Sequence, residues 1–105
     1  MKARNPGLFA VAALIMALLS LSGCGGVLYL VDVNSASGKV ETAKQLGAEK
    51  LAPYEYYYAR EHLQKAMSEA AEGDYSDALE FSDVAEQYAD KAIKLAKEAH
   101  RGAGR

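Results

Sequence analysis

The clearest pattern in the sequence is a stripe of small residues near its C-terminus. Its members recur in steps of four and three residues, and they are Ala78, Ser82, Ala85, Ala89, Ala92, Ala96 and Ala99. This spacing places them on one face of an α-helix, where small side chains let another helix approach closely. The opposite face is polar and carries Glu80, Asp83, Gln87, Asp90, Lys94, Lys97 and Arg101. The pattern predicts a helix over 75–99 with one packed and one solvated face, on which Asp90 and Lys94 can pair one turn apart.

The preceding segment, 53–72, has the pattern of a second helix. Pro53 suits a first helical turn because it has no backbone N–H to satisfy. One face of this helix carries Tyr56, Ala59, Leu63, Ala66 and Ala70. Gly73 suits the residue after the helix, and Asp74 suits the N-cap of the next one. The two helices are therefore expected to form an antiparallel hairpin.

An earlier helix is expected to begin near residue 35 and to end at Pro53. Its candidate N-caps are Asn34, Ser35 and Ser37, and its inner face carries Val40, Ala43, Gly47 and Leu51. The chain is thus expected to be all-α, a short helical bundle in which this helix packs across the hairpin. The alanine-rich helical domain would span 35–100, and the tail 101–105 would be disordered.

The N-terminus has the pattern of a secretory signal peptide. A basic segment with Lys2 and Arg4 precedes an apolar stretch over 8–19, as in such signals. A helix over this stretch extends about 18 Å, well short of a hydrocarbon core of about 30 Å. An uncleaved anchor over 8–31 would be long enough, but it would place Ser20, Ser22 and several glycines inside the membrane.

The residues Leu21-Ser22-Gly23-Cys24 end this signal and resemble the lipobox of bacterial lipoproteins. The resemblance implies that a signal peptidase recognises Leu21, Ser22 and Gly23 and removes 1–23. Cys24 would then carry a covalent diacylglycerol and an N-acyl chain. Several acyl chains anchor a protein stably where a single one does not.

The segment 24–34 is expected to be a membrane-proximal tether. Gly25 and Gly26 stand where lipoproteins retained in the inner membrane often have aspartate, so the outer membrane, facing the periplasm, is the expected location. The apolar run over 27–31 either lies at the bilayer surface, with Tyr29 at the interface, or begins the first helix. Docking of this run onto a partner protein is the alternative.

Charge and cysteine content narrow the range of functions. The chain has 12 basic and 14 acidic residues, and removal of Lys2 and Arg4 leaves 10 basic residues and a net charge of about −4. No basic stripe is present, which argues against a nucleic-acid partner because phosphate recognition requires clustered Lys and Arg. The single cysteine cannot form an internal disulfide.

No combination of residues points to catalysis. His62 and His100 lie far apart and belong to no metal-ligand spacing. The sequence has neither a glycine-rich phosphate loop nor a Gly-x-Ser-x-Gly elbow. We therefore expect a protein that is not an enzyme, with no metal and no cofactor apart from the lipid on Cys24.

The run Tyr54-Glu55-Tyr56-Tyr57-Tyr58 is strongly aromatic. Successive side chains of a helix point about 100° apart, so these rings cannot all face one core. In one interpretation, Tyr54 and Tyr58 wedge against neighbouring helices and Tyr57 is half-exposed. In the other, a docking patch for a protein, a glycan or the bilayer interface draws on Tyr54, Tyr56, Tyr57 and Tyr58, since tyrosine combines contact area with a polar tip.

Three features follow one another between about residues 35 and 99. They are the segment Gly47-Ala-Glu-Lys-Leu-Ala-Pro53, the turn Gly73-Asp-Tyr75-Ser-Asp-Ala78 and the alanine-spaced helix. Together they resemble the bacterial domain-of-unknown-function family 4398, which is found on small lipoproteins. The resemblance implies a helical fold and an envelope location without an established activity. The turn also resembles a tetratricopeptide unit, but a single unit is too few for a solenoid.

These observations predict an envelope lipoprotein with a structural or adaptor role. Cys24 would anchor it to the membrane, and the helical body would bind another envelope protein or a second copy of itself. Two alternatives remain at this point. One is a ligand- or lipid-binding module whose alanine seam opens for an apolar guest, and the other is a homo-oligomeric coiled-coil spacer.

Overall fold

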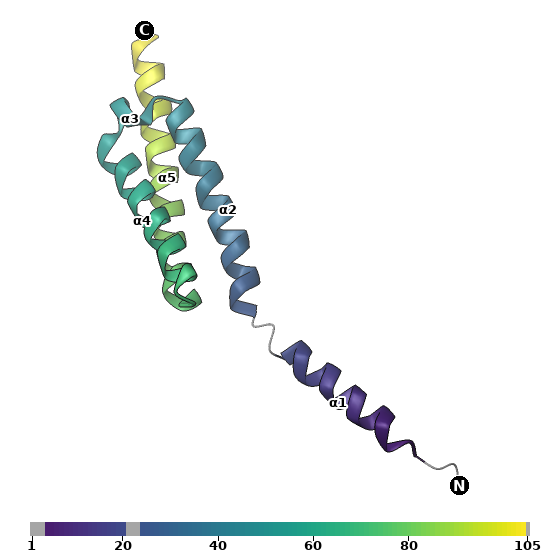
Figure 1. Cartoon of the computed structure of the whole chain (residues 1–105). Helices are drawn as coiled ribbons and strands as arrows, with labels where there is room; N and C mark the ends of the chain where they lie inside the picture. Colours follow the sequence, from purple (N-terminus) through teal and green to yellow (C-terminus); the bar gives the residue numbers. More distant parts are fainter. Residues whose placement is uncertain (1–3, 21–23, 105) are drawn as a thin grey trace.

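The computed structural model describes residues 4–20 and 24–104. These residues form α1 (Pro6–Ser20), α2 (Cys24–Gln45), α3 (Ala48–Leu51), α4 (Pro53–Ala71) and α5 (Tyr75–Ala103), and they contain no strand. The long helices α2, α4 and α5 lie side by side as a bundle, with α3 at the end away from α1 (Figure 1). The prediction of an all-α bundle built on an antiparallel hairpin is confirmed.

The first helix, α1, lies apart from this bundle (Figure 1). It makes no contact with the other helices among the described residues, and its large apolar side chains are exposed. Within 4–20 and 24–104, no helix combines the length and the apolarity that a membrane crossing requires. The residues expected to guide cleavage, Leu21, Ser22 and Gly23, lie outside the described residues. Cys24 is the first residue of α2.

The helix α2 starts at Cys24 rather than near residue 35. A second stripe with steps of four and three explains the earlier start, and it consists of Tyr29, Val33, Ala36, Val40 and Ala43, all buried or half-buried. Because this stripe keeps facing the bundle, the helix continues through the segment expected to be a tether. Asn34, Ser35 and Ser37 lie inside the helix, so the prediction that they cap it is wrong.

The end of α2 also differs from the expected continuous helix up to Pro53. Gly47 has a φ of 78°, a left-handed conformation that glycine adopts without strain, and it separates α2 from α3. His100 Nε2 lies 2.7 Å from the carbonyl oxygen of Leu46, one of the carbonyls that a helix end leaves unpaired. Since a carbonyl can only accept, His100 donates this hydrogen bond and ties the end of α2 to α5.

The turn between α4 and α5 has the geometry expected from its sequence. Gly73 has a φ of 85°, and the amide of Asp74 donates to the carbonyl of Glu69 at 2.9 Å, which is the Schellman pattern. The Asp74 carboxylate then accepts a hydrogen bond from the amide of Asp77 at 3.1 Å. One short turn therefore ends α4 and caps α5. At its other end α5 reaches Ala103, so the part of the tail over 101–103 is helical rather than disordered.

The core of the bundle consists almost entirely of alanine. All of its buried hydrophobic residues except Val33, Tyr56 and Leu63 are alanines. The predicted seam of α5 is confirmed, since its members Ala78, Ser82, Ala85, Ala89, Ala92 and Ala96 are each 0% exposed, while Ala99 is half-buried. The small side chains allow close approach of the helices, but each contributes little apolar area to stability.

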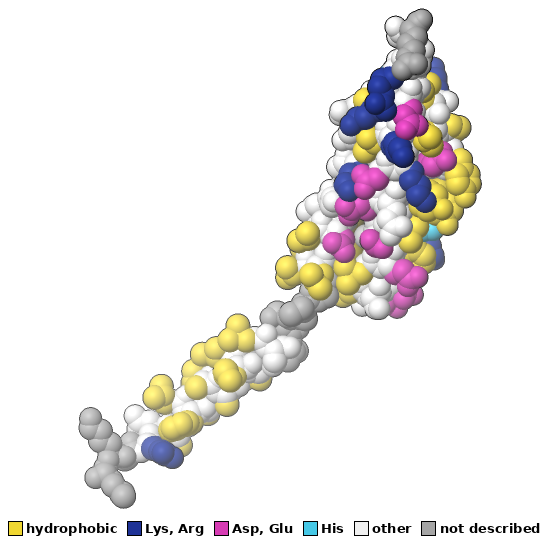
Figure 2. Space-filling view, turned by 180° about the vertical axis from the view of Figure 1, so that it is seen from behind, with side chains coloured by type: hydrophobic (Ala, Val, Ile, Leu, Met, Phe, Trp, Pro, Cys, Tyr) yellow, Lys and Arg dark blue, Asp and Glu magenta, His cyan; other side chains and the backbone are white. Residues whose placement is uncertain are grey.

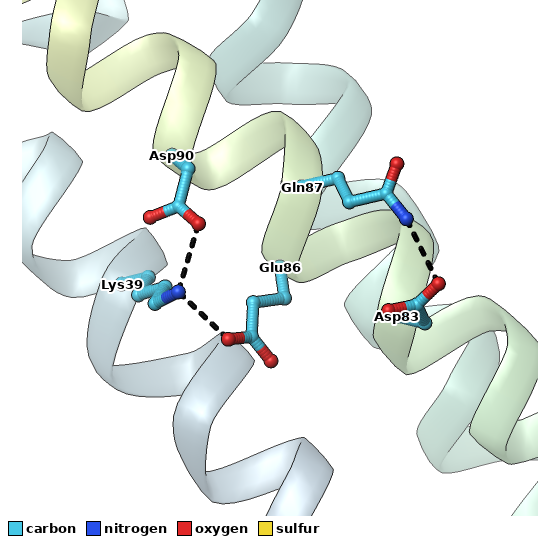
Figure 3. Close-up of polar contacts among 5 residues, drawn as sticks. All are labelled: Lys39, Asp83, Glu86, Gln87 and Asp90. Carbon is cyan, nitrogen blue, oxygen red and sulfur yellow. Dashed lines mark hydrogen bonds and ion pairs between the residues drawn. The ribbon is translucent and has the colours of Figure 1, made fainter.

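A polar contact on the surface joins α2 to α5 (Figure 3). Lys39 Nζ lies 2.7 Å from Glu86 and 2.8 Å from Asp90. Asp90 thus pairs across helices rather than with Lys94, the partner expected from sequence. The hydrogen bonds to Asp90 and Glu86 raise the pKa of the Lys39 ammonium group, and the same contact lowers the pKa of the Glu86 carboxyl.

Candidate functional site

One surface of the α4–α5 hairpin carries a row of aromatic side chains, which we call the aromatic ridge. It consists of Tyr54, Tyr58 and His62 from α4 and of Phe81 and Tyr88 from α5. The α4 members recur every four residues, which places them on one face of the helix. The two α5 members are seven residues apart and therefore also share a face.

The rings of the ridge touch one another without a break. Tyr58 is central, with its ring centre 4.1 Å from that of Tyr88 and 4.1 Å from the stacked ring of His62. Tyr54 lies 5.7 Å from Tyr58 and 6.3 Å from Tyr88, and His62 lies 5.9 Å from Phe81. Offset and edge contacts at these separations stabilise aromatic pairs by about 0.5–1.5 kcal/mol each.

The ridge lies at the surface although its rings are large. Tyr54 is 65% exposed, and Tyr58, His62, Phe81 and Tyr88 are half-buried. In Figure 2 hydrophobic side chains crowd the edge of the bundle formed by α4. The contacts between rings fix their orientation, so the ridge presents a preformed surface rather than separate mobile side chains.

Lysine side chains lie over two rings of the ridge. Lys91 Nζ is 4.2 Å from the ring centre of Tyr88, and Lys65 Nζ is 5.1 Å from that of Phe81. Such cation–π contacts contribute about 0.5–1 kcal/mol at exposed sites. Because Lys65 also pairs with Glu69, it is Lys91 that leaves positive charge beside the apolar strip, which suits a partner with an apolar centre and a carboxylate at its margin.

The structure separates the four tyrosines that the sequence grouped together. Tyr54 and Tyr58 belong to the ridge, and both contact the ring of Tyr88. Tyr56 is only 4% exposed and packs in the core among alanines of α2, α3 and α5. Tyr57 is 40% exposed on another side, where its hydroxyl donates a hydrogen bond to Glu49 at 2.9 Å.

Two of these tyrosines have raised pKa values. The neighbouring phenol of Tyr88 raises the pKa of Tyr54, and the hydrogen bond to Glu49 raises the pKa of Tyr57. Both hydroxyls therefore remain protonated at neutral pH. The Tyr57 hydroxyl uses its proton in the hydrogen bond to Glu49, and neither phenol adds negative charge to the surface.

Sequence reasoning missed His62, Phe81 and Tyr88 as members of the ridge. The signal for His62 was present, because it follows Tyr58 by one helical turn. Phe81 and Tyr88 flank the alanine seam of α5 on one side, but nothing local shows that this side faces the exposed tyrosines of α4. Only the packing of α4 against α5 brings the two rows together.

The remaining polar groups have local structural roles. Oxygens of Glu69, Asp74 and Asp77 lie within 4.8 Å of one another at the α4–α5 turn. Asp74 caps α5 there, and Glu69 pairs with Lys65 at 3.1 Å. His62 Nδ1 lies 2.9 Å from the carbonyl oxygen of Tyr58, and His100 of α5 hydrogen-bonds the end of α2. These groups account for helix ends and surface pairs.

Comparison with known proteins identifies the body of the chain. One family model matches residues 31–103, and its description is Domain of unknown function (DUF4398). No curated protein and no solved structure matches the chain. The matched span includes the alanine seam, the α4–α5 turn and the whole aromatic ridge, and it confirms the resemblance seen in the sequence. The chain belongs to the DUF4398 family.

Proposed function

We propose that the chain is an envelope lipoprotein that acts as a non-catalytic adaptor, in which a lipid on Cys24 holds the protein to the outer membrane and the aromatic ridge binds another envelope protein. The observation that carries this proposal is that the large aromatic side chains of α4 and α5 lie mostly at the surface rather than in the core. Alanines close the core, whereas aromatic rings from two helices pack together at the surface. An aromatic side chain can bury about 150–250 Å², so rings needed only for stability would be expected inside.

The composition of the ridge favours a protein partner. Tyrosine is enriched among the residues that dominate binding energy, because it offers a large rigid surface with a polar tip. Tyr54 and Tyr58 present such surfaces, and the rings already contact one another, so binding would order few additional groups. Lys65 and Lys91 lie beside the ridge, where charges contribute mainly to orientation and association rate.

The arrangement of the helices supports a cleavable signal and a lipid anchor. Because α1 makes no contact with the bundle among the described residues, its removal would cost the bundle no packing. Cys24 would become the first residue of α2, so the lipid would attach directly to a helix rather than to a flexible tether. Gly25 and Gly26 after the cysteine favour the outer membrane over the inner one.

The alternative of a ligand-binding seam is less well supported. Every member of the seam from Ala78 to Ala96 is fully buried, so an apolar guest would have to separate helices that now touch. A homo-oligomeric spacer remains an alternative that the same experiment distinguishes.

Photo-crosslinking in living cells tests the adaptor proposal. A photoreactive phenylalanine analogue replaces Tyr54, the most exposed member of the ridge, in the full lipidated protein. A control probe replaces Lys94, which is exposed on the polar face of α5. We expect a discrete crosslinked product from position 54 and none from position 94, with mass spectrometry identifying the partner. A product of twice the mass of the chain would support the spacer, and equal labelling at both positions would refute specific docking.

Alanine variants separate docking from folding. Tyr54→Ala should abolish capture of the partner and lower the free energy of unfolding less than a core substitution does, because the side chain is 65% exposed and loses only its ring contacts with Tyr58 and Tyr88. Tyr56→Ala should instead lower the free energy of unfolding by about 3–5 kcal/mol, as large-to-small changes in a core do. If Tyr54→Ala melts as early as Tyr56→Ala, the ridge is a structural element.

Acylation can be tested separately. Cys24→Ala should eliminate incorporation of a labelled fatty acid and leave the precursor uncleaved, whereas the wild-type chain should incorporate the label and fractionate with the outer membrane. Label in the Cys24→Ala chain would refute the proposed site.

A further inference from the structure

The first two turns of α2 expose large apolar side chains on their outer face. The exposed fractions are 66% for Val27, 55% for Leu28, 57% for Leu30 and 62% for Val31. From residue 34 the exposed positions of the same helix change in character, and they are Asn34, Ser37, Gly38, Glu41, Thr42, Lys44 and Gln45. The apolar surface is therefore confined to the part of α2 that adjoins Cys24.

The end of the hairpin extends this apolar surface. An open groove of about 460 Å³ is lined by Val27 and Leu30 from α2, by Met67 and Ala71 from α4 and by Tyr75 from α5. The ring of Tyr75 lies 6.0 Å from that of Tyr29. Figure 2 shows hydrophobic side chains at the same end of the bundle, on the side towards α1.

We propose that this end of the bundle is a second membrane contact, which inserts the first two turns of α2 and the adjoining end of the hairpin into the lipid interface. The inference rests on the proposed lipid anchor, because acyl chains on Cys24 would hold this surface against the bilayer. The distance from Cys24 to Val31 along the helix is about 10 Å, and each headgroup region of a bilayer is roughly 5–8 Å thick, since the whole bilayer measures about 40–45 Å and its hydrocarbon core about 30 Å. The apolar surface thus ends at about the depth where the interface gives way to water.

Aromatic and acidic side chains agree with this orientation. Tyr29 and Tyr75 lie beside the groove, and tyrosine is enriched where hydrocarbon meets headgroups. Glu72 and Asp74 are exposed at the tip of the hairpin, where they would remain among the headgroups and favour zwitterionic over anionic lipid. Insertion would therefore be deepest on the side of α2.

The contact would also determine where the aromatic ridge is presented. Tyr54 lies near the start of α4, about 25 Å along the helix from its end at Ala71. With the hairpin end at the membrane, the bundle stands upright and holds Tyr54 away from the lipid. A lipid tether alone would leave the orientation of the ridge undetermined.

Single-tryptophan fluorescence tests this contact, because the chain has no tryptophan of its own. The full lipidated protein carries either Val31→Trp or Gly38→Trp and is reconstituted into phosphatidylcholine vesicles with brominated acyl chains. Gly38 lies two helical turns beyond Val31 on the same face, it is exposed, and a Cβ atom added there meets nothing within 4 Å. The two variants thus place the same probe on one face at two heights.

The Val31→Trp probe should lose most of its emission in brominated vesicles and resist quenching by aqueous iodide, and the Gly38→Trp probe should behave in the opposite way. Equal quenching of both probes by iodide overturns the second contact. Flotation with the vesicles and the mass of the Cys24 peptide report the anchor independently. A lipidated, floating protein with a water-exposed Val31→Trp probe refutes only the contact, whereas a chain without acyl groups refutes the anchor and the contact together.

Discussion

Replacing Ala85 with leucine should force apart the helices of the bundle. Ala85 is 0% exposed and packs with Val33 and Ala36 of α2 and with Leu63 of α4. Leucine adds three carbon atoms where neighbours from two other helices leave no space. Because the seam has the same small residues above and below, any separation at Ala85 also loosens contacts along α5.

The size of the effect follows from the burial of this position. Overpacking of a core typically costs about 1–3 kcal/mol, and Ala85→Leu should lie near 3 kcal/mol because it disturbs two helix interfaces at once. For a domain of this size each kcal/mol lowers the melting temperature by about 4–8 °C. The expected decrease is therefore about 12–24 °C.

Thermal unfolding of the full chain in detergent, followed by far-ultraviolet circular dichroism, measures this decrease. Lys94→Leu is the matched control, since it places the same side chain on the solvated face of the same helix. Its effect should stay within about 0.5 kcal/mol. If Ala85→Leu melts within about 4 °C of the parent, or no lower than Lys94→Leu, the seam is not a close-packed contact and the reasoning fails.

Two further substitutions test polar groups of the bundle. Ser82 Oγ is buried without a hydrogen-bond partner among the described residues, so Ser82→Ala should raise the free energy of unfolding by about 1 kcal/mol in urea denaturation; a clear loss would mean that the hydroxyl is bonded. Lys39→Met should lower the free energy of unfolding by less than about 1 kcal/mol at neutral pH, because the ion pairs of Lys39 with Glu86 and Asp90 are partly exposed. Lys39 lowers the pKa of Glu86, so the stabilisation is present above the ordinary carboxyl pKa of 4.5 and is lost as the pH falls through the lowered value. Asp90 and Glu86 raise the pKa of Lys39 above 10.5, so the stabilisation by charged Lys39 is complete below that pH and is lost as the pH rises through the raised pKa. Urea denaturation of the parent and of Lys39→Met at falling pH should show that their free energies of unfolding converge. A difference that stays constant with pH would exclude the ion pair as the cause of the difference.

The helical pattern of α2 was predicted correctly, but the helix begins at Cys24 and not near residue 35. The side chains of Asn34, Ser35 and Ser37 made a helix start plausible, since such residues often cap helices. The stripe of Tyr29, Val33 and Ala36 has the same spacing as the seam of α5, and it continues the helix back towards Cys24. A cap stabilises only the end of a helix, whereas a buried stripe stabilises several turns by packing. The helix therefore extends back along the stripe and does not begin at the capping residues.

Local sequence determined the features whose causes lie within one or two helical turns. These are the seam of α5, the inner face of α4 and the turn at Gly73 and Asp74, because helix geometry and a single left-handed residue specify them. Tertiary structure alone decided that Tyr56 is buried while Tyr54 and Tyr58 contact Tyr88. It also decided that Asp90 forms an ion pair with Lys39 of α2 rather than with Lys94 of its own helix. Each of these contacts depends on the rotation and the register of one helix against another. The small residues of the stripes resemble one another, so they specify neither the rotation nor the register.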